Sequence, residues 1–159
     1  MASSKSTDWS EAAARETASK FAGVKGGLLP ALHALQDRFG HVPKPAIALL
    51  ADLFNLSRAE VHGVVTFYHD FRDAPAGRHV LKLCRAEACQ AVGAVALADA
   101  AKRHLGLDWD ETSADGRWTL EPVFCLGLCA CGPAAMLDGE PKARLDGRAL
   151  KTLIAETGE

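Results

Sequence analysis

The pattern of hydrophobic and polar positions changes near residue 77, and the part before it is typical of helices. Apolar residues recur there every three or four positions, which places them on one face of a helix. The helices predicted from this spacing run from Glu11 to about Phe21, over residues 28–39, from about Pro45 to Phe54, and from Arg58 through Tyr68. Their short connections favour antiparallel neighbours, so this half of the chain is predicted to form a small helical bundle.

Start and stop signals support these boundaries. Ser10 can cap the first helix, and Gly40 can end the second in the left-handed conformation that glycine adopts readily. Ser57 and Glu60 have the spacing of a capping box, in which each side chain bonds the backbone N–H of the other residue. The fourth helix is therefore expected to begin directly after Ser57.

The second half alternates between strand and helix patterns. The predicted elements are a strand over 79–83 running into Cys84, a helix over 91–104 with Val92, Val95, Ala96 and Ala100 on one face, one or two strands over 117–124, a strand over 134–137, its partner over 142–145, and a helix over 148–156. Asp138-Gly139 is a hairpin turn signal, and Asp146 can cap the last helix. The fold class is thus α/β, with expected boundaries of 1–25 for an N-terminal segment holding one helix, 26–76 for the bundle and 77–159 for the α/β domain.

Composition and charge narrow the classes of function. The 159 residues are 48% hydrophobic and carry a net charge of −2, so nothing points to a nucleic-acid partner or an anionic membrane. No apolar run reaches the roughly 18 residues that a membrane span needs, so no membrane insertion is expected. The first residues lack the apolar region of a secretory signal, so a cytoplasmic location is expected.

Four of the five cysteines form two close pairs. Cys84 and Cys89 are separated by four residues, and Cys125 and Cys129 by three. In a cytoplasmic chain, paired cysteines indicate metal binding or redox chemistry rather than structural disulfides. If the strands before Cys84 and Cys125 are neighbours, both cysteine loops leave the same edge of the sheet, and four thiolates meet there.

Spacing alone does not identify the bound metal. Four thiolates suit a [2Fe–2S] cluster, and they equally suit a structural zinc ion in a protein-interaction module. A thiol–disulfide enzyme is a third reading, although the usual redox spacing of Cys-x-x-Cys is absent. Cys131, the fifth cysteine, is expected to be buried without a role; the alternative is that it replaces one of the ligands or resolves an oxidised neighbour. No Gly-rich nucleotide fingerprint or nucleophile–base pair occurs, so no substrate site is expected on this chain.

A resemblance to a known family favours iron. The motifs that carry it are the run Leu28–Pro43, the run Ser57–Tyr68, the two cysteine pairs, and the run Asp115–Glu121. In this order they resemble the thioredoxin-like [2Fe–2S] subunit of respiratory complex I and its relatives, from about residue 26 onward. The resemblance implies a helical bundle followed by a thioredoxin-like [2Fe–2S] ferredoxin domain. It also implies one [2Fe–2S] cluster, which falls here on Cys84, Cys89, Cys125 and Cys129.

The first cysteine loop indicates which relative is nearest. The run Leu83–Gly93 looks most like the gamma subunit of soluble, molybdenum-containing, NAD-dependent formate dehydrogenase. The equivalent subunits of NAD-reducing hydrogenase and of complex I are the alternatives. The resemblance implies a hetero-oligomer in which this chain exchanges single electrons with a flavoprotein subunit that binds FMN and NAD. Molybdenum cofactor and further iron–sulfur clusters are expected only on partner subunits, one of them a molybdenum-containing catalytic subunit. Tyr68 and Phe71 are expected to help dock a partner, whereas Phe67 is expected in the bundle core.

Overall fold

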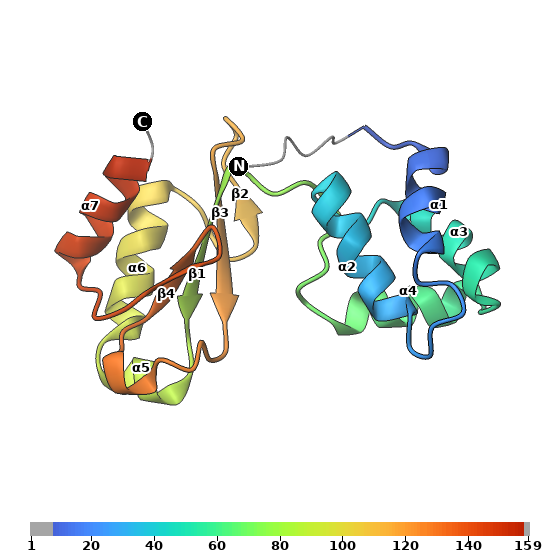
Figure 1. The fold of residues 1–159 in the computed structure, drawn as a ribbon. Helices are drawn as coiled ribbons and strands as arrows, with labels where there is room; N and C mark the ends of the chain where they lie inside the picture. The colour runs from blue at the N-terminus through green and yellow to red at the C-terminus, as the bar shows by residue number, and fades with distance from the viewer. Residues whose placement is uncertain (1–7, 158–159) are drawn as a thin grey trace. The chain divides into compact units, whose positions relative to one another are not determined.

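The computed structural model describes residues 8–157, which divide into two compact units at the bond between Pro75 and Ala76. The first unit consists of helices, and the second is built on a mixed β-sheet with helices packed against it (Figure 1). The α/β class predicted from the sequence is therefore confirmed. No helix within residues 8–157 is long and apolar enough to cross a membrane.

The helical unit contains α1 (Glu11–Ser19), α2 (Leu28–Phe39), α3 (Lys44–Phe54) and α4 (Arg58–Phe67). The predicted end signals are present. The Ser10 side chain accepts a hydrogen bond from the Ala13 amide, Gly40 ends α2 in the left-handed conformation, and Ser57 and Glu60 form both bonds of a capping box. These signals satisfy backbone groups that a helix leaves unpaired at its ends, which is why they fix the boundaries locally.

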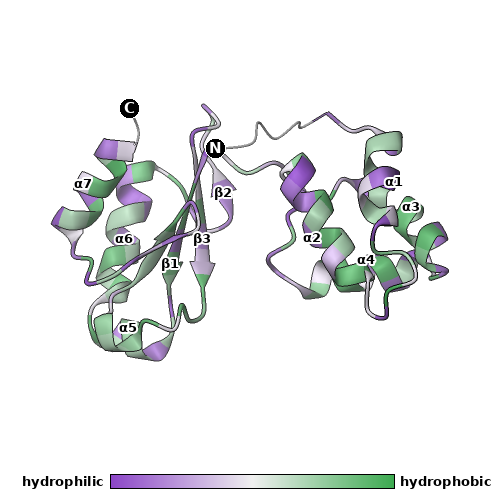
Figure 2. Cartoon of the chain, in the orientation of Figure 1, coloured by the Kyte–Doolittle hydropathy of each residue, from purple (hydrophilic) through white to green (hydrophobic). Residues whose placement is uncertain are grey.

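The core of this unit lies between all four helices. Leu32 and Leu35 of α2, Leu50 of α3 and Val61 of α4 are fully buried, and so are Ala14 and Ala18 of α1. Small alanine side chains let α1 approach its neighbours closely. Figure 2 shows α3 as hydrophobic along most of its length, in keeping with its burial on several sides. The assignment of residues 1–25 to a segment separate from the bundle stays a prediction, and its first seven residues lie outside the described part of the chain.

The second unit has five strands in the order β2-β3-β1-β4-β5. They are β1 (His79–Cys84), β2 (Glu111–Thr112), β3 (Trp118–Val123), β4 (Ala135–Leu137) and β5 (Glu140–Lys142). The central strands β1 and β3 are parallel neighbours, and the other pairs are antiparallel. Figure 1 shows α6 and α7 on one face of this sheet and α5 beyond the carboxyl end of β1. The strand pairing thus brings the carboxyl ends of β1 and β3 to one edge.

The predicted helix over 91–104 is wrong in its start and in its buried face. The structure has α5 (Glu87–Ala91) and then α6 (Ala94–Leu105), separated at Gly93, whose φ of 105° is a left-handed conformation that interrupts a helix. The restart shifts the face that meets the sheet. Its buried residues are Ala94, Leu97, Ala98 and Ala101, whereas Val92 and Val95 are exposed.

The predicted partner strand over 142–145 is also misplaced. The tight turn at Asp138-Gly139 sets Glu140 directly opposite Leu137, so β5 ends at Lys142. The two residues before Asp146 leave the ladder and bond the second cysteine loop instead: the Arg144 amide donates to the Cys131 carbonyl, and the Leu145 amide to the Pro133 carbonyl. The last helix, α7 (Gly147–Thr157), is capped by Asp146 as predicted.

Candidate metal centre

Two cysteine loops leave the sheet at the same edge. Cys84 is the last residue of β1 and pairs in register with Val123, the last residue of β3. Cys125 follows two residues later. The junction is fixed by the Arg85 amide, which donates to the Val123 carbonyl at 2.7 Å, and by the Cys84 amide, which donates to the Ala134 carbonyl at 3.0 Å. The condition set by the sequence, that these strands be neighbours, is met.

The first cysteine pair is buried. Cys84 is 2% exposed and Cys89, within α5, is 1% exposed. They form a small apolar cluster with Ala94 and Ala134, and the short α5 turns the chain so that the second thiol comes back to the first. Burial is the main cause that raises the pKa of Cys89, and a hydrogen bond with the Cys84 thiol is the next. This pair is shielded from water by the structure of the domain itself.

The second pair is exposed and lies on a tightly turned loop. The Sγ atoms of Cys125 and Cys129 are 3.8 Å apart. The Gly127 amide donates a hydrogen bond to the Cys125 sulfur at 3.3 Å. Gly127 has a φ of 73° and Cys125 a φ of 128°, both on the side of the backbone map that side chains disfavour. The backbone is therefore strained at Cys125, whereas Gly127 adopts its conformation readily, and the loop presents two sulfurs and a donor together.

The two pairs influence each other electrostatically. Burial and the Cys84 thiol raise the pKa of Cys89, and Cys129 also contributes. The pKa of Cys129 is raised mainly by Cys125 and further by Cys84. Like charge on neighbouring sulfurs contributes to both raised pKa values, behind burial for Cys89 and behind the hydrogen bond with Cys125 for Cys129. The positive charge of a bound metal would offset this repulsion, and the thiols would release their protons.

The spacing of the second sulfur pair fits one tetrahedral metal bound by two thiolates. Two thiolates bound at about 2.3 Å to one tetrahedral metal lie about 3.8 Å apart, which agrees with the 3.8 Å between Cys125 and Cys129. Within residues 8–157, no group of three or more His, Cys, Asp or Glu side chains surrounds a position suited to a single ion.

Comparison with known proteins decides between the metals. The model of the family described as thioredoxin-like [2Fe–2S] ferredoxin matches residues 14–158. The chain belongs to this ferredoxin family. Its cofactor is accordingly one [2Fe–2S] cluster, so that prediction is confirmed and the zinc-module reading is not supported. The predicted thioredoxin-like fold is confirmed by the same match.

Individual relatives extend the comparison. A subunit of NADH-quinone oxidoreductase from Escherichia coli strain K12 is 36% identical over 126 residues, which are 79% of this chain and 76% of that protein. The corresponding subunit from Rhizobium meliloti is 32% identical over 137 residues, 86% of this chain and 82% of that protein. The crystal structure of an air-oxidised NAD⁺-reducing [NiFe]-hydrogenase aligns with a TM-score of 0.71 and 28% identity over 83% of this chain. The present chain spans only 23% of that hydrogenase chain.

Cys131 of this ferredoxin-family chain differs from its prediction. It is partly exposed rather than buried, within a single helical turn, η1 (Cys129–Cys131). Its amide donates to the Leu128 carbonyl, and its carbonyl accepts from Arg144. It is not among the groups that shift the pKa of Cys89 or Cys129. Cys131 thus has a backbone role in holding the second cysteine loop against the chain that follows β5.

Three exposed apolar residues lie in or close after the cysteine loops in the sequence, and the sequence pattern did not predict their exposure. Phe124, directly before Cys125, is 70% exposed, and Val92 and Val95 are half-exposed beyond the first loop. Figure 2 shows the segment after β3 as hydrophobic. Val92 and Val95 do not belong to the set of residues that α6 buries against the sheet, and this is the feature that accounts for their exposure. We call Phe124, Val92 and Val95 the apolar rim.

The aromatic residues of the helical unit also correct a prediction. Phe67, expected in the core, is 74% exposed, whereas Phe71, expected at a docking surface, is buried. Phe67 stacks edge-on against Tyr68 at 5.1 Å between ring centres, and Tyr68 in turn contacts Phe71. Val61, the buried residue of α4, marks the inner face of that helix, and Phe67 at its end lies off this face.

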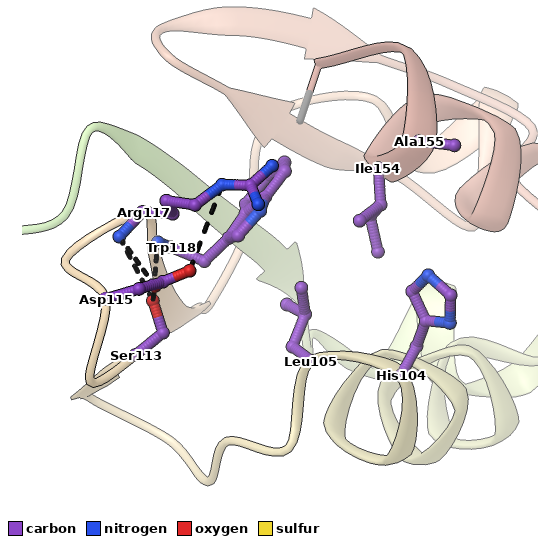
Figure 3. A pocket seen from close by; sticks show the side chains of 8 residues that line it. All are labelled: His104, Leu105, Ser113, Asp115, Arg117, Trp118, Ile154 and Ala155. Atoms are coloured by element: carbon purple, nitrogen blue, oxygen red, sulfur yellow. Dashed lines mark hydrogen bonds and ion pairs between the residues drawn. The ribbon is translucent and has the colours of Figure 1, made fainter. Parts of the chain in front are cut away.

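A hollow of about 290 Å³ lies elsewhere in the second unit (Figure 3). Its lining residues are His104, Leu105, Ser113, Asp115, Arg117, Trp118, Ile154 and Ala155. Trp118 begins β3, whereas the cysteines follow the end of that strand at Val123. Six residues of strand span about 20 Å, so the hollow is remote from the sulfurs. The Asp115 carboxylate in its wall is already held by Ser113 and by the Arg117 amide, so it belongs to a turn rather than to a binding site.

Proposed function

We propose that this chain is an electron-transfer subunit that holds one [2Fe–2S] cluster on Cys84, Cys89, Cys125 and Cys129. The observation that carries the proposal is the convergence of two cysteine pairs at one sheet edge, with the Cys125 and Cys129 sulfurs 3.8 Å apart. A [2Fe–2S] cluster takes up and releases one electron at a time, at a potential that the protein around it adjusts.

The two pairs have different tasks in this proposal. The buried pair, Cys84 and Cys89, anchors the cluster to the core of the domain, because both thiols are almost inaccessible. The exposed pair, Cys125 and Cys129, forms the side from which electrons enter and leave. The Gly127 amide donates to the Cys125 sulfur, and a hydrogen bond of this kind stabilises negative charge on the site.

The proposed electron partner is a flavoprotein subunit that binds FMN and NAD. The relatives are named as subunits of NADH-quinone oxidoreductase and as an NAD⁺-reducing hydrogenase, which supports a place in an NAD-dependent oxidoreductase complex. Electron transfer needs close approach, and the apolar rim beside Cys125 offers a surface that a partner can cover. Exposed apolar patches often mark sites of protein–protein interaction.

We further propose that the complex is an NAD-dependent formate dehydrogenase with a separate molybdenum-containing catalytic subunit and a cytoplasmic location. The support is the run Leu83–Gly93, which resembles the gamma subunit of that enzyme. The alternatives are the equivalent positions in complex I and in an NAD-reducing hydrogenase, which the named relatives support.

The test uses this chain purified with its natural partners under anaerobic conditions. NADH should reduce the cluster of the complex, seen by electron paramagnetic resonance (EPR), and should not reduce the isolated chain. Formate should then reduce the same cluster, whereas hydrogen or a quinol should not. Reduction of the isolated chain by NADH would contradict the need for a flavoprotein. Reduction by hydrogen instead of formate would assign the complex to the hydrogenase alternative.

A further inference from the structure

One tryptophan of the second unit holds two cations. The Arg85 guanidinium carbon lies 5.2 Å from the centre of the Trp109 ring, and the Lys102 Nζ lies 4.5 Å from it. Trp109 is half-buried in the connection between α6 and β2. Each cation is attracted by the negative face of the ring, and this attraction strengthens where water is partly excluded. The ring therefore restricts the conformations of both long side chains.

The two cations differ in how their charge is balanced. The Lys102 Nζ forms an ion pair with the Asp108 carboxylate, and this contact lowers the pKa of Asp108. Within residues 8–157, no carboxylate forms an ion pair with Arg85. The positive charge of Lys102 is thus neutralised locally, whereas that of Arg85 remains.

Arg85 is fixed at three points. Its amide donates to the Val123 carbonyl at 2.7 Å, its carbonyl accepts from the Gln90 side chain at 2.6 Å, and its guanidinium packs on Trp109. Arg85 also follows Cys84 directly in the chain, so their Cα atoms are about 3.8 Å apart. The unbalanced charge is therefore held on the residue next to a buried thiol of the candidate centre.

We propose that Arg85, held in place by Trp109, raises the reduction potential of the cluster. This inference rests on the proposed function, since it requires a cluster on Cys84 and its partners. The added electron increases the negative charge at the sulfurs, and a fixed cation on the residue that follows Cys84 stabilises that form over the oxidised one. Because Arg85 is partly exposed, solvent weakens the effect without abolishing it. Arg85 supplies the positive charge, and Trp109 influences the potential only by holding Arg85 in place.

The opposite charge in the same loop has a weaker influence. Glu87 lies two residues beyond Arg85 and is exposed at the start of α5. No aromatic ring or cation fixes its side chain within the described residues, so water screens its carboxylate. Glu87 supplies a control: its substitution changes the loop charge by one unit, as that of Arg85 does, but at a solvated position.

The experiment measures the midpoint potential by EPR-monitored redox titration of the full chain. In Arg85→Gln, the ratio of reduced to oxidised cluster at a fixed ambient potential should fall about fivefold, equivalent to about 40 mV for one electron. Arg85→Lys should lower the midpoint potential less than Arg85→Gln does, since lysine keeps the charge and loses only the planar stacking on Trp109. Glu87→Gln should shift the potential less, and upward. The double variant Arg85→Gln with Trp109→Leu should shift it no further than Arg85→Gln alone.

The outcomes separate this inference from the proposed function. Failure of the wild-type chain to assemble a cluster would overturn the proposed function. A cluster with unchanged iron content and EPR g values, but with the wild-type potential in Arg85→Gln, would overturn only the role of Arg85. If Arg85→Gln does not assemble a cluster, the potential of Trp109→Leu is measured instead. Release of Arg85 from the ring should lower that potential, and an unchanged value would contradict the proposal.

Discussion

Gly132 lies against Cys89 so closely that a Cβ atom on the glycine would stand 3.3 Å from the cysteine sulfur. The same Cβ would stand 3.0 Å from the Val92 Cγ2. Gly132 belongs to the segment that returns from the second cysteine loop to β4, whereas Cys89 belongs to the first loop. The two loops are thus packed against each other at a position where only glycine leaves the thiol undisturbed.

Gly132→Ala should weaken the site without unfolding the domain. The added methyl group must displace either the Val92 side chain or the Cys89 sulfur, and overpacking of this kind costs about 1–3 kcal/mol. We expect less iron and labile sulfide per chain and a faster loss of the visible absorbance in the presence of a chelator. The comparison is made on anaerobically purified protein.

Two further variants identify the cause. Gly147→Ala is the matched control, because a Cβ there would meet no atom within 4 Å. Adding Val92→Ala to Gly132→Ala should restore most of the cluster, since it removes the nearest obstructing atom. If the double variant is no better than the single one, displacement of Val92 is not the route by which Gly132→Ala acts.

Gly127→Ala should loosen the second cysteine loop for a different reason. A Cβ at Gly127 would meet nothing within 4 Å, but its φ of 73° lies in the left-handed region. This conformation costs a residue with a side chain about 1–2 kcal/mol. Relaxation of the loop would also withdraw the amide that bonds the Cys125 sulfur. We expect faster cluster loss and a more negative midpoint potential. Gly127→Asn should have a smaller effect, because asparagine tolerates this conformation; equal effects of the two variants would exclude backbone strain as the cause.

The apolar rim gives a prediction about partner binding. Phe124→Ser removes an aromatic ring that is 70% exposed beside Cys125. If the ring is buried by the flavoprotein, the dissociation constant should rise at least tenfold, while iron content and EPR signal stay unchanged. Isothermal titration of the two purified subunits measures this. Val24→Ser, at an exposed apolar residue of the helical unit, is the control. Equal affinities for wild type and Phe124→Ser would place the interface elsewhere.

The capping box of α4 gives a prediction about pH. Hydrogen bonds from the Ser57 amide and hydroxyl lower the pKa of Glu60 below its ordinary value of 4.5. A carboxyl whose pKa is depressed by folding stabilises the folded state above its unfolded pKa, and this contribution is lost as the pH falls through the folded value. Glu60→Gln should therefore lower the urea midpoint of the helical unit at pH 7, and the difference should disappear as the pH falls well below 4.5. A difference that persists at pH 3 would show that the charge of Glu60 is not its source.

Local signals in the sequence were enough to predict the helical unit. The Ser57–Glu60 box, the Ser10 cap and the Gly40 stop each satisfy backbone groups within a few residues, so they act regardless of distant contacts. The two cysteine pairs were likewise recognisable from spacing as a candidate site, and β1 and β3 are the sheet neighbours on which that prediction depended.

The errors arose where distant contacts decide the structure. Residues 91–101 carry two interleaved apolar stripes, and the sequence does not say which one meets the sheet. The break at Gly93 selects the stripe with Leu97 and leaves Val92 and Val95 on the surface beside the cysteine loops. In the same way, Arg144 and Leu145 leave the predicted strand because their amides bond Cys131 and Pro133. Phe67 was assigned to the core because it is aromatic, although its position in α4 faces outward.

The most direct measurement is the iron, acid-labile sulfide and zinc content of the anaerobically purified chain, together with its EPR spectrum after reduction. We expect two irons, two sulfides and one rhombic signal per chain. Serine in place of Cys84, Cys89, Cys125 or Cys129 should abolish or alter that signal, whereas Cys131→Ser should leave it unchanged. A colourless chain that contains zinc and no labile sulfide, even after reconstitution with iron and sulfide, would contradict the central claim.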